Sequence, residues 1–499
     1  MKGEPMKQKS LKLSLLLLVF AILSSSMFGC NGSGKGNEDT QPESSSQTVD
    51  DKYEADNLPS DLDYDGREIK VLTWEETKAD DWADTLNGEA INDATYTSRS
   101  YVAERLNITF NISAQKGSWD YRNQFASNLE AYMLSNINFD IVGQYTPAAA
   151  LTATKGLLED LSKLKYINFD KPWWPGDMLD SCRVGNSMYF CSGDITPTCI
   201  NAIGSVFVNL NLMEEYGIEE NIYEVVKSGN WTLETLKNMF IGVVGSSSTS
   251  EMGVYALSMM HRGVYDNLFY GGGLTFVSHD DENYLTLNED IMGEKMDNWY
   301  QACHDLLWDN PDVLCLEYQS GLTPEHLTKD DLTIENTFMN EKSILHMSTE
   351  LLDAKKYLRN AEFNFAVIPY PKYDSNQKDY YTITNYWVTM YGVPTSATDA
   401  DVSAAVLEAM GSSAYRSMTP KIYEDSFQYR FLQNPENAEM LDLIHDTMVY
   451  DTGRLFSDDI AIFSTFRNAF YNTKSWTTLY GEKIDIWLSG IDSVNSKLS

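Results

Sequence analysis

The sequence is poor in the residues that build metal sites, disulfide frameworks and several kinds of catalytic centre. Its 499 residues include 6 cysteines and 6 histidines. No two cysteines have the C-x-x-C spacing, and no H-E-x-x-H or G-x-S-x-G motif occurs. We therefore expect no zinc site, no catalytic motif of these kinds and no bound cofactor.

Positive charge is also scarce. The chain has 37 Lys and Arg against 73 Asp and Glu, which gives a formal net charge of -36. Nucleic acids and acidic polymers are poor partners for such a surface, because their own negative charge is repelled. The acidity is typical of a protein that stays soluble outside the cell, and we expect no nucleic-acid partner.

The cysteines beyond residue 30 are odd in number and irregularly spaced. They are Cys182, Cys191, Cys199, Cys303 and Cys315. This pattern does not indicate a full disulfide framework. One bridge within the first three of these cysteines and a set of buried free thiols both fit the sequence.

No apolar run near the N-terminus is long enough to span a membrane as a helix. Residues 13–23 fall well short of the ~20 apolar residues that a bilayer requires. The run follows a basic start and precedes M-F-G-C at 27–30, where a glycine before Cys30 is typical of a lipoprotein cleavage site. We predict that residues 1–29 are a lipoprotein signal peptide and that Cys30 is lipidated, with ordinary secretion as the alternative.

The segment that follows has almost nothing to bury. Residues 30–58 consist mainly of Gly, Ser, Gln, Glu and Asp. Such a composition predicts a disordered tether. Together with a lipid on Cys30, it would hold a folded body at the extracellular face of the cell membrane.

The rest of the chain is longer than one hydrophobic core usually serves, so we expect two or more lobes. Strand and helix patterns alternate, with strands at 69–74, 108–112 and 139–143 and helices at 90–106 and 121–135. This alternation predicts an α/β fold with parallel strands. Ligands bind at the carboxyl ends of such strands, which places Trp74, Glu75 and Tyr145 on one rim.

A series of short motifs extends over most of the chain after the tether. They are I-K-V-L-T-W at 69–74, N-D-A at 92–94, V-A-E-R-L-N-I at 102–108, F-D-I-V at 139–142, G-L-L-E-D-L at 156–161, F-V-N at 207–209, L-M-E-E-Y-G-I at 212–218, W-T-L-E at 231–234, F-M-N-E-K at 338–342 and F-A-V-I-P-Y-P at 365–371. In their order and spacing the chain resembles the extracellular solute-binding proteins of ABC importers, in the carbohydrate-uptake class.

The resemblance implies a periplasmic-binding-protein-like fold, in which two α/β lobes are joined by hinge-crossing strands and enclose a ligand cleft. Lobe 1 would comprise residues 59–190 and 371–412, and lobe 2 residues 195–363 and 413–499, with C-terminal helices packing on either lobe. The crossings would lie near 189–194 and 364–370, with a return to lobe 1 through 381–410. The implied function is capture of a sugar or oligosaccharide and its delivery to ABC permease subunits by a monomer.

Sugars need aromatic rings for their C–H faces and polar side chains for their hydroxyl groups. The candidates at expected strand ends are Trp74, Glu75, Tyr145, Asp194, Tyr270, Glu350 and Trp387. For each of them the alternative is ordinary core or surface packing. Trp119 fits a ring on the rim and a core position equally well.

Two other functions also fit the sequence. A secreted glycoside hydrolase needs two suitably spaced carboxyl groups, and this chain is rich in Asp and Glu. A surface scaffold without a small ligand is the other alternative. Turnover of a glycan would favour the hydrolase, whereas the absence of a thermal shift with any sugar would favour the scaffold.

Overall fold

The computed structural model describes residues 53–244, 253–259, 263–307, 310–315, 328, 330–426, 435–469 and 475–498. All of them belong to one compact unit, Val49–Ser499. The predicted signal peptide, the lipidation site at Cys30 and residues 30–52 of the predicted tether lie outside the described residues. Across the described ranges, every helix is too short or too polar to cross a lipid bilayer.

The first sheet has four strands in the order β11-β3-β1-β2. Its members are β1 (Arg67–Trp74), β2 (Ile108–Gln115), β3 (Ile141–Tyr145) and β11 (Thr389–Gly392). β1 runs parallel to β2 and β3, whereas β11 runs antiparallel to β3. The strands predicted at 69–74 and 108–112 are confirmed, the strand predicted at 139–143 is shifted by two residues to 141–145, and β11 joins them from far along the chain.

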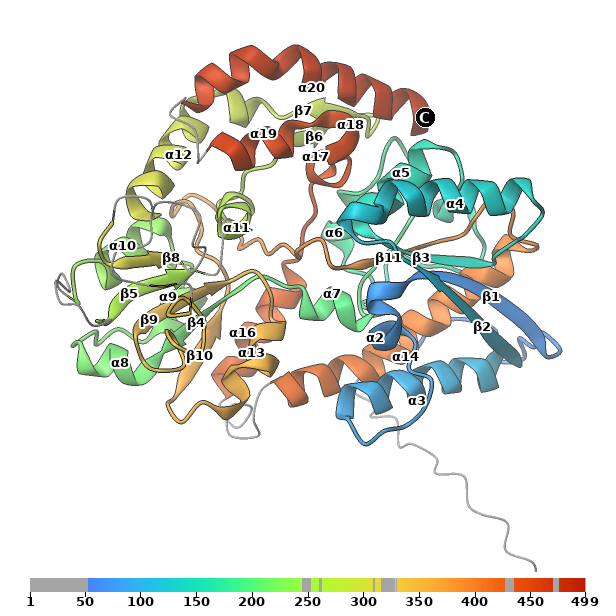
Figure 1. The fold of residues 1–499 in the computed structure, drawn as a ribbon, viewed down its shortest axis with the longest axis horizontal. Helices are drawn as coiled ribbons and strands as arrows, with labels where there is room; N and C mark the ends of the chain where they lie inside the picture. Colours follow the sequence, from blue (N-terminus) through green and yellow to red (C-terminus); the bar gives the residue numbers. More distant parts are fainter. Residues whose placement is uncertain are drawn as a thin grey trace, which may run out of the picture. The chain divides into compact units, whose positions relative to one another are not determined.

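Helices connect and cover the strands of this sheet. α3 (Ala90–Leu106) and α4 (Arg122–Leu134) form the crossovers that parallel strands require. The Glu89 carboxylate accepts a hydrogen bond from the Asn92 amide and caps α3, and Asn107 ends this helix with φ 49°. On one face of the sheet α3 packs on α14 (Ala400–Ser426), and on the other face α4 packs on α5 (Thr146–Thr154) (Figure 1).

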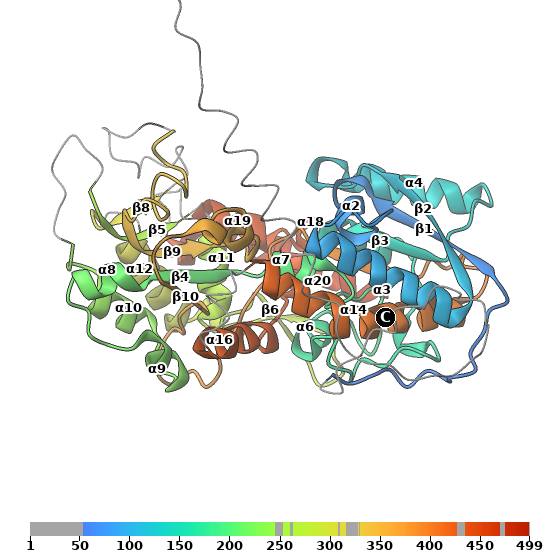
Figure 2. The same cartoon turned by 90° about the horizontal axis from the view of Figure 1, so that it is seen from below.

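The second sheet has five strands in the order β10-β4-β9-β5-β8. They are β4 (Ser205–Asn209), β5 (Tyr255–Met259), β8 (Val313–Cys315), β9 (Ser343–Ser348) and β10 (Phe365–Ile368). Every residue of these strands is buried, as expected for a sheet that is covered on both faces. α8 (Leu210–Glu215) contacts β9 and β10, and α16 (Pro435–Asp446) lies beside β10 (Figure 2).

Further helices and one β-hairpin surround the two sheets. They are α2 (Lys78–Asp81), α6 (Gly176–Asp180), α7 (Pro197–Asn201), α9 (Ile222–Lys227), α10 (Leu233–Phe240), α11 (Gly263–Gly271), α12 (Glu294–Leu307), α13 (Leu352–Lys356), the hairpin of β6 (Val277–His279) and β7 (Leu285–Leu287), α17 (Thr452–Leu455), α18 (Ser457–Ile460), α19 (Ile462–Ala469) and α20 (Trp476–Leu498). α20 packs on α18 and β7 and also contacts α5. The C-terminal helices therefore connect the hairpin with a helix that covers the first sheet.

Two segments run between the sheets. Residues 189–204 lead to β4, and residues 380–388 lead back to β11. The first segment pairs with the second, because the Gly204 amide donates to the Ile383 carbonyl at 2.9 Å, and it also pairs with β11, where the Cys191 and Tyr391 amides and carbonyls bond to each other. The expected first crossing at 189–194 lies in the first segment. The expected second crossing at 364–370 is wrong, because 365–368 form β10 and pair along their full length with β4.

The described end of the predicted tether packs on the folded unit. Asp56 pairs with Arg105 of α3 at 2.8 Å, and the Asp56 amide donates to Ser412 of α14 at 3.1 Å. Leu58 belongs to the hydrophobic core. Residues 53–58 thus differ from the expectation for 30–58, since polar partners on two distant helices hold a segment whose own composition offers little to bury.

The cysteine cluster settles as buried thiols. Cys182, Cys191 and Cys199 are free and buried. Burial raises the pKa of the Cys199 thiol to about 12, so that this thiol stays protonated and unreactive. Of the two alternatives that the sequence left open for this cluster, the structure has the free thiols.

Candidate functional site

Two cavities of about 610 and 620 Å³ adjoin each other beside the crossing segments. We call the first the aromatic chamber; it is lined by Trp119, Tyr145, Gly263, Asp266, Asn267, Thr349, Glu350, Asn385, Tyr386, Trp387, Arg454, Ser457, Asp458, Phe463, Ser464 and Arg467. We call the second the charged chamber; it is lined by Glu76, Thr77, Ala79, Asp80, Asn87, Glu89, Ile91, Asn92, Thr198, Asn201, Ala202, Glu350, Leu352, Lys355, Lys356, Asn385 and Trp387. Glu350, Asn385 and Trp387 line both, so the chambers form one cleft.

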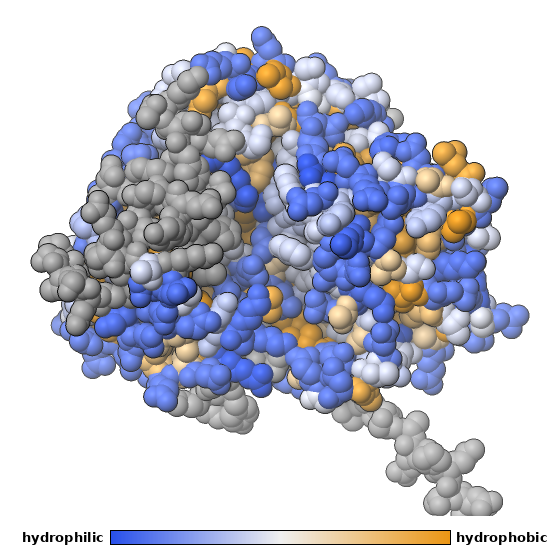
Figure 3. Space-filling model, in the orientation of Figure 1, coloured by the Kyte–Doolittle hydropathy of each residue, from blue (hydrophilic) through white to orange (hydrophobic). Residues whose placement is uncertain are grey.

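The space-filling view shows that the face turned to the viewer is mostly polar (Figure 3). Near the middle of this face the surface is hollowed, and hydrophobic residues are visible inside the hollow. An apolar interior with a polar surround is the usual character of a small-ligand site.

The crossing segment at 385–387 supplies the rings of the aromatic chamber. The Trp387 amide donates to the Asn385 side-chain oxygen at 2.7 Å, which forms a tight turn. Tyr386 is held from the opposite side, where its hydroxyl donates to the Arg454 carbonyl at 2.9 Å. Trp387 remains 47% exposed, so its ring is available to a ligand.

Rings from the first sheet stand behind this turn. The Trp74 ring lies 5.2 Å from Tyr145 and 5.3 Å from Trp387, measured between centroids. Trp74 itself is fully buried, and its indole nitrogen donates to Thr389 at 2.8 Å. It therefore supports Trp387 from behind and lines neither chamber. Burial keeps the pKa of the Tyr145 phenol well above its ordinary value, so this group is a neutral hydroxyl.

Ion pairs occupy the opposite wall of the aromatic chamber. Arg467 of α19 binds Asp266 of α11 through Nε and Nη2, with Nε 3.1 Å from Oδ2. Burial opposes the charge of Arg467, but Asp266 outweighs burial and raises the arginine pKa. Arg122 binds Asp458 in the same fork geometry at 2.7 and 2.9 Å, and its guanidinium lies 4.0 Å from the centroid of Trp119.

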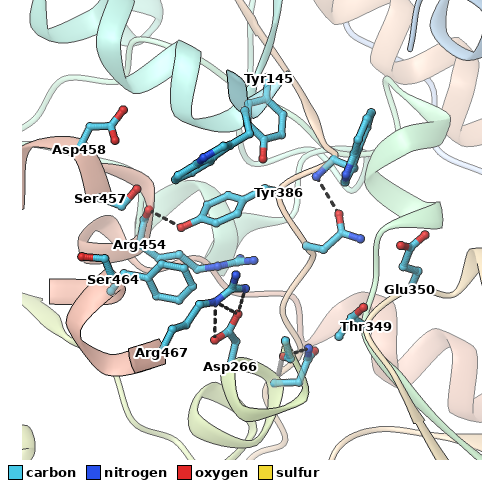
Figure 4. Close-up of a pocket in the computed structure, with 16 residues that line it drawn as sticks. Tyr145, Asp266, Thr349, Glu350, Tyr386, Arg454, Ser457, Asp458, Ser464 and Arg467 are labelled. Atoms are coloured by element: carbon cyan, nitrogen blue, oxygen red, sulfur yellow. Dashed lines mark hydrogen bonds and ion pairs between the residues drawn. The ribbon is translucent and has the colours of Figure 1, made fainter. Parts of the chain in front are cut away.

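Arg454 lies among the rings of the same wall. Its guanidinium is 4.3 Å from the centroid of Tyr386 and 5.6 Å from that of Phe463, and its Nη1 donates to the Thr384 carbonyl at 2.6 Å. Figure 4 shows this side chain running along Tyr386 and ending next to the Arg467 guanidinium. Nearby, the Asn267 side-chain oxygen is buried without a hydrogen-bond partner among the described residues.

The charged chamber has a different wall. Lys355 of α13 pairs with Glu89, the cap of α3, at 2.5 Å. Lys356 lies 3.8 Å from Glu350, whose carboxyl pKa is raised by burial and lowered less by that lysine. The two Glu76 oxygens accept from the Gly117 and Ser118 amides at 3.0 and 3.1 Å. Most of the carboxylates that line the charged chamber thus already have partners within the protein.

A buried acid lies behind the wall of the charged chamber. Asp81 of α2 accepts hydrogen bonds from Thr389 at 2.5 Å, from Thr77 at 3.2 Å and from Thr196. Burial raises the pKa of Asp81 to about 6, although these hydroxyl donors and Arg99 act in the opposite direction. Because Thr389 also receives the Trp74 bond, this acid network anchors the rings of the neighbouring chamber.

The comparisons with known proteins bear on the fold. No protein-family model and no curated protein matches the chain. The galacto-N-biose/lacto-N-biose I-binding protein of the ABC transporter from Bifidobacterium longum matches with TM-score 0.53 at 12% identity, covering 87% of this chain and 98% of that one. The cyclic α-maltosyl-1,6-maltose binding protein from Arthrobacter globiformis matches with TM-score 0.51 at 14% identity, covering 87% and 99%.

A cyclo/maltodextrin-binding protein complexed with maltotetraose matches with TM-score 0.53 at 12% identity, again over 87% of this chain and 99% of that one. The chain has the two-lobe fold of the periplasmic binding proteins. The first and second sheets are the centres of its lobes, and the two-chambered cleft lies beside the segments that cross between them. The fold class that the resemblance implied is confirmed.

Within this two-lobe fold, the predicted site residues separate into two groups. Tyr145, Glu350 and Trp387 line the cleft, and Trp74 packs directly behind two of them. Parallel pairing of β1 with β3 brings Trp74 and Tyr145 to the same edge, as the rim argument required.

The other candidates line neither chamber. Glu75 is exposed beside Glu76, which lines the charged chamber instead. Asp194 is buried and accepts from His445 of α16 at 3.1 Å, and this pair raises the pKa of His445 to about 10 despite its burial. Tyr270 is buried in α11 and packs on Phe269 and Phe276. Asp194 and Tyr270 thus pack in the core, which was the alternative to ligand binding that the sequence allowed.

Several residues of the cleft carry no signal that the sequence argument used. Tyr386 directly precedes Trp387 and could have been found from that neighbour. Asp266, Arg454 and Arg467 come from three separate helices, and only the tertiary fold brings them together. Trp119, for which a rim and a core position were both open, is 45% exposed and lines the aromatic chamber.

Proposed function

We propose that this protein is the substrate-binding component of an ABC importer and that it captures an oligosaccharide in the cleft between its lobes. The observation that carries the proposal is the aromatic chamber itself. Its lining combines the rings of Trp119, Tyr386 and Trp387 with hydrogen-bonding side chains. Stacking on C–H faces and replacement of water at hydroxyl groups are the two contacts that sugars need.

The buried Asn267 oxygen adds to this argument. A buried acceptor without a donor is costly, and rotation of the Asn267 side chain away from Gly204, against which this oxygen packs, would let a ligand hydroxyl group satisfy it. The chamber volume of about 610 Å³ lies in the range of small-ligand sites. Proteins of the same fold are described as binding lacto-N-biose and maltotetraose, which supports a sugar as the ligand here.

The ion pairs favour binding over hydrolysis. Glycoside hydrolysis needs one carboxyl group as acid and another as base or nucleophile. In the aromatic chamber, Asp266 and Asp458 are each engaged by an arginine in fork geometry. An arginine partner occupies the oxygens of a carboxylate, which leaves Glu350 as the carboxyl group of this chamber without an arginine.

Delivery to permease subunits and anchoring through Cys30 complete the proposal. Both rest on the N-terminal motif and on the likeness of the fold, with the folded unit acting as a monomer at the outer face of the cell membrane. Labelling with radioactive palmitate in growing cells tests the anchor. We expect label and membrane association in the wild type and neither in Cys30→Ala.

A thermal-shift screen over neutral and acidic oligosaccharides tests the binding function. We expect a rise in melting temperature with one class of oligosaccharide and recovery of that sugar unchanged by chromatography. Trp387→Ala should abolish the shift, whereas Tyr101→Ala, which removes a 40% exposed ring that lines neither chamber, should preserve it. Breakage of the sugar would favour the hydrolase, and the lack of any shift would favour the scaffold.

A further inference from the structure

When Arg122 and Lys356, which lie behind the wall of the aromatic chamber, are counted with the charged residues that line it, one cation is left without a carboxylate. Each of its carboxylates has a cationic partner: Arg467 for Asp266, Arg122 for Asp458 and, at 3.8 Å, Lys356 for Glu350. Arg454 is the exception among the charged residues that line this chamber. No described carboxylate lies within ion-pair distance of it, although the residue is only 2% exposed.

A buried guanidinium without a counter-ion is unusual because its desolvation is costly. The ring of Tyr386 and the Thr384 carbonyl offset part of this cost. Neither of them carries a negative charge, and Nε of Arg454 has no partner among the described residues. The ion pair of Arg467 and Asp266 beside it is neutral as a unit, so one positive charge is left over on this wall.

From this we propose that the sugar carries a carboxylate, as in uronate-containing oligosaccharides, and that the Arg454 guanidinium receives it. The inference rests on the proposed function and names the substrate class for the same cleft. A guanidinium offers parallel N–H donors that match the two oxygens of a carboxylate, and such pairs are among the strongest hydrogen bonds in proteins. The rings of Tyr386 and Trp387 would stack on the sugar face at the same time.

The acidic surface of the chain does not oppose this inference at short range. The net charge of -36 repels anions at a distance, but salt screens exposed charges over roughly 8 Å at physiological ionic strength. Inside a chamber with low-dielectric walls, the nearest charge dominates. We therefore expect the net charge to slow the arrival of an acidic sugar without removing its preference for the chamber.

Chemical reduction of the uronate carboxyl group provides a matched ligand pair, because it makes the sugar neutral and leaves its linkages intact. Oligogalacturonates, oligomannuronates and glucuronate-bearing xylo-oligosaccharides would be titrated by calorimetry beside their carboxyl-reduced forms. We expect one acidic oligosaccharide to bind at least about 10-fold tighter than its reduced form, which is the value of roughly one charge-assisted hydrogen bond. Raising the ionic strength should reduce the difference in affinity between the acidic and the reduced form, because salt screens the attraction between the two charges.

Variants at Arg454 separate recognition from a structural role. Arg454→Gln should lower affinity for the acidic form by about 10-fold and change affinity for the reduced form by less than about 3-fold. Arg454→Lys keeps the positive charge but loses the forked pair of N–H donors. Its affinity for the acidic form should lie between those of the wild type and Arg454→Gln. If Arg454→Gln does not fold by circular dichroism, the wild-type comparison of the two ligand forms decides alone.

The outcomes distinguish this inference from the function on which it rests. Binding of a neutral oligosaccharide with no preference for the acidic form would overturn the inference and leave the proposed function standing. If Arg454→Gln lost affinity for both ligand forms equally, the inference would also be overturned, because that is the behaviour of a residue that only holds the chamber together. Failure of every oligosaccharide to bind the wild type would instead reject the proposed function itself.

Discussion

The two chambers of the cleft have nearly equal volumes, about 610 and 620 Å³, yet their walls are chemically unlike. The aromatic chamber has ring faces, an unmatched guanidinium and an unsatisfied amide oxygen. The charged chamber has Trp387 as its aromatic residue, and its lysines are paired with carboxylates. Size therefore does not say which chamber binds a ligand, whereas unsatisfied groups and exposed rings do.

The difference follows from the elements that build each wall. Besides the crossing segment at 385–387, which lines both chambers, the aromatic chamber is lined by residues of α11 and of the C-terminal helices α17, α18 and α19. The charged chamber is lined by the ends of α2, α3 and α13. Charged side chains at helix ends bond to the backbone of those helices, as Glu89 does when it caps α3. Fewer of their hydrogen-bonding positions are then free for a ligand.

The largest expected effect is on stability and concerns the buried ion pair of the aromatic chamber. Arg467→Met should lower the free energy of unfolding by about 3 kcal/mol, because it leaves the buried Asp266 carboxylate without its partner. Urea denaturation measures this change. The double variant Arg467→Met/Asp266→Leu should recover much of the loss, since neither charge of this pair then remains. A single variant as stable as the wild type would show that solvent reaches this wall freely.

The next effect is on ligand affinity and concerns the ring that the two chambers share. Trp387→Ala should weaken oligosaccharide binding by about 30-fold, or roughly 2 kcal/mol, because a half-exposed ring face is lost from the stack. Calorimetric titration measures it, with Tyr101→Ala as the matched aromatic control. Since Trp387 stands at the edge of its ring cluster, its removal should cost little stability. Unchanged affinity would place the ligand away from the rings.

A smaller effect is expected from pH and concerns the acid behind the charged chamber. Burial raises the pKa of Asp81 to about 6 from its ordinary value of 3.8, so the folded state holds this proton more tightly than the unfolded state. The resulting stabilisation is complete below the unfolded value and is lost as the pH rises through about 6. We expect the wild type to melt at a higher temperature near pH 5 than near pH 8.

Asp81→Asn should reduce this pH dependence by about 1 kcal/mol, because an amide does not titrate. Differential scanning calorimetry at both pH values measures the difference. Asp353, Asp451 and Glu408 also have pKa values raised by burial, to about 6, 6 and 7, so part of the dependence should persist in the variant. A wild type that is equally stable at both pH values would mean that Asp81 is ionised in the folded state throughout.

The parts of the cleft that sequence could predict are those set by local pattern. β1 and β3 were readable because a buried strand is a short apolar run, and their parallel pairing places Trp74 and Tyr145 at one edge. The same reasoning did not reveal that Trp74 would lie behind the surface. How deeply a residue at a strand end is buried depends on which segment packs over it. Trp74 is covered by the turn at 385–387, which lies far along the chain.

The parts that sequence could not predict are those made by distant partners. Arg467 and Asp266 are separated by 201 residues, and Asp194 and His445 by 251. A charged residue looks the same in a sequence whether it will meet a ligand or a counter-ion. Asp194 was therefore predicted as a ligand contact although an imidazole satisfies it, whereas Arg454, for which the described residues supply no carboxylate, carried no local signal.

The smallest effect is expected from the exposed ion pair of the charged chamber. Lys355→Met should change the free energy of unfolding by less than about 0.5 kcal/mol and ligand affinity by less than about 3-fold, because Glu89 and Lys355 are both partly exposed and solvent screens them. Urea denaturation and calorimetric titration measure the two quantities. The charge-swapped double variant Glu89→Lys/Lys355→Glu restores the mutual attraction but removes the carboxylate that caps α3, so it should lose about 1 kcal/mol of stability while its ligand affinity stays within about 3-fold of the wild type. A loss of affinity above about 10-fold in Lys355→Met, restored by Lys355→Arg but not by the swap, would extend the binding surface into the charged chamber and end the distinction between the two.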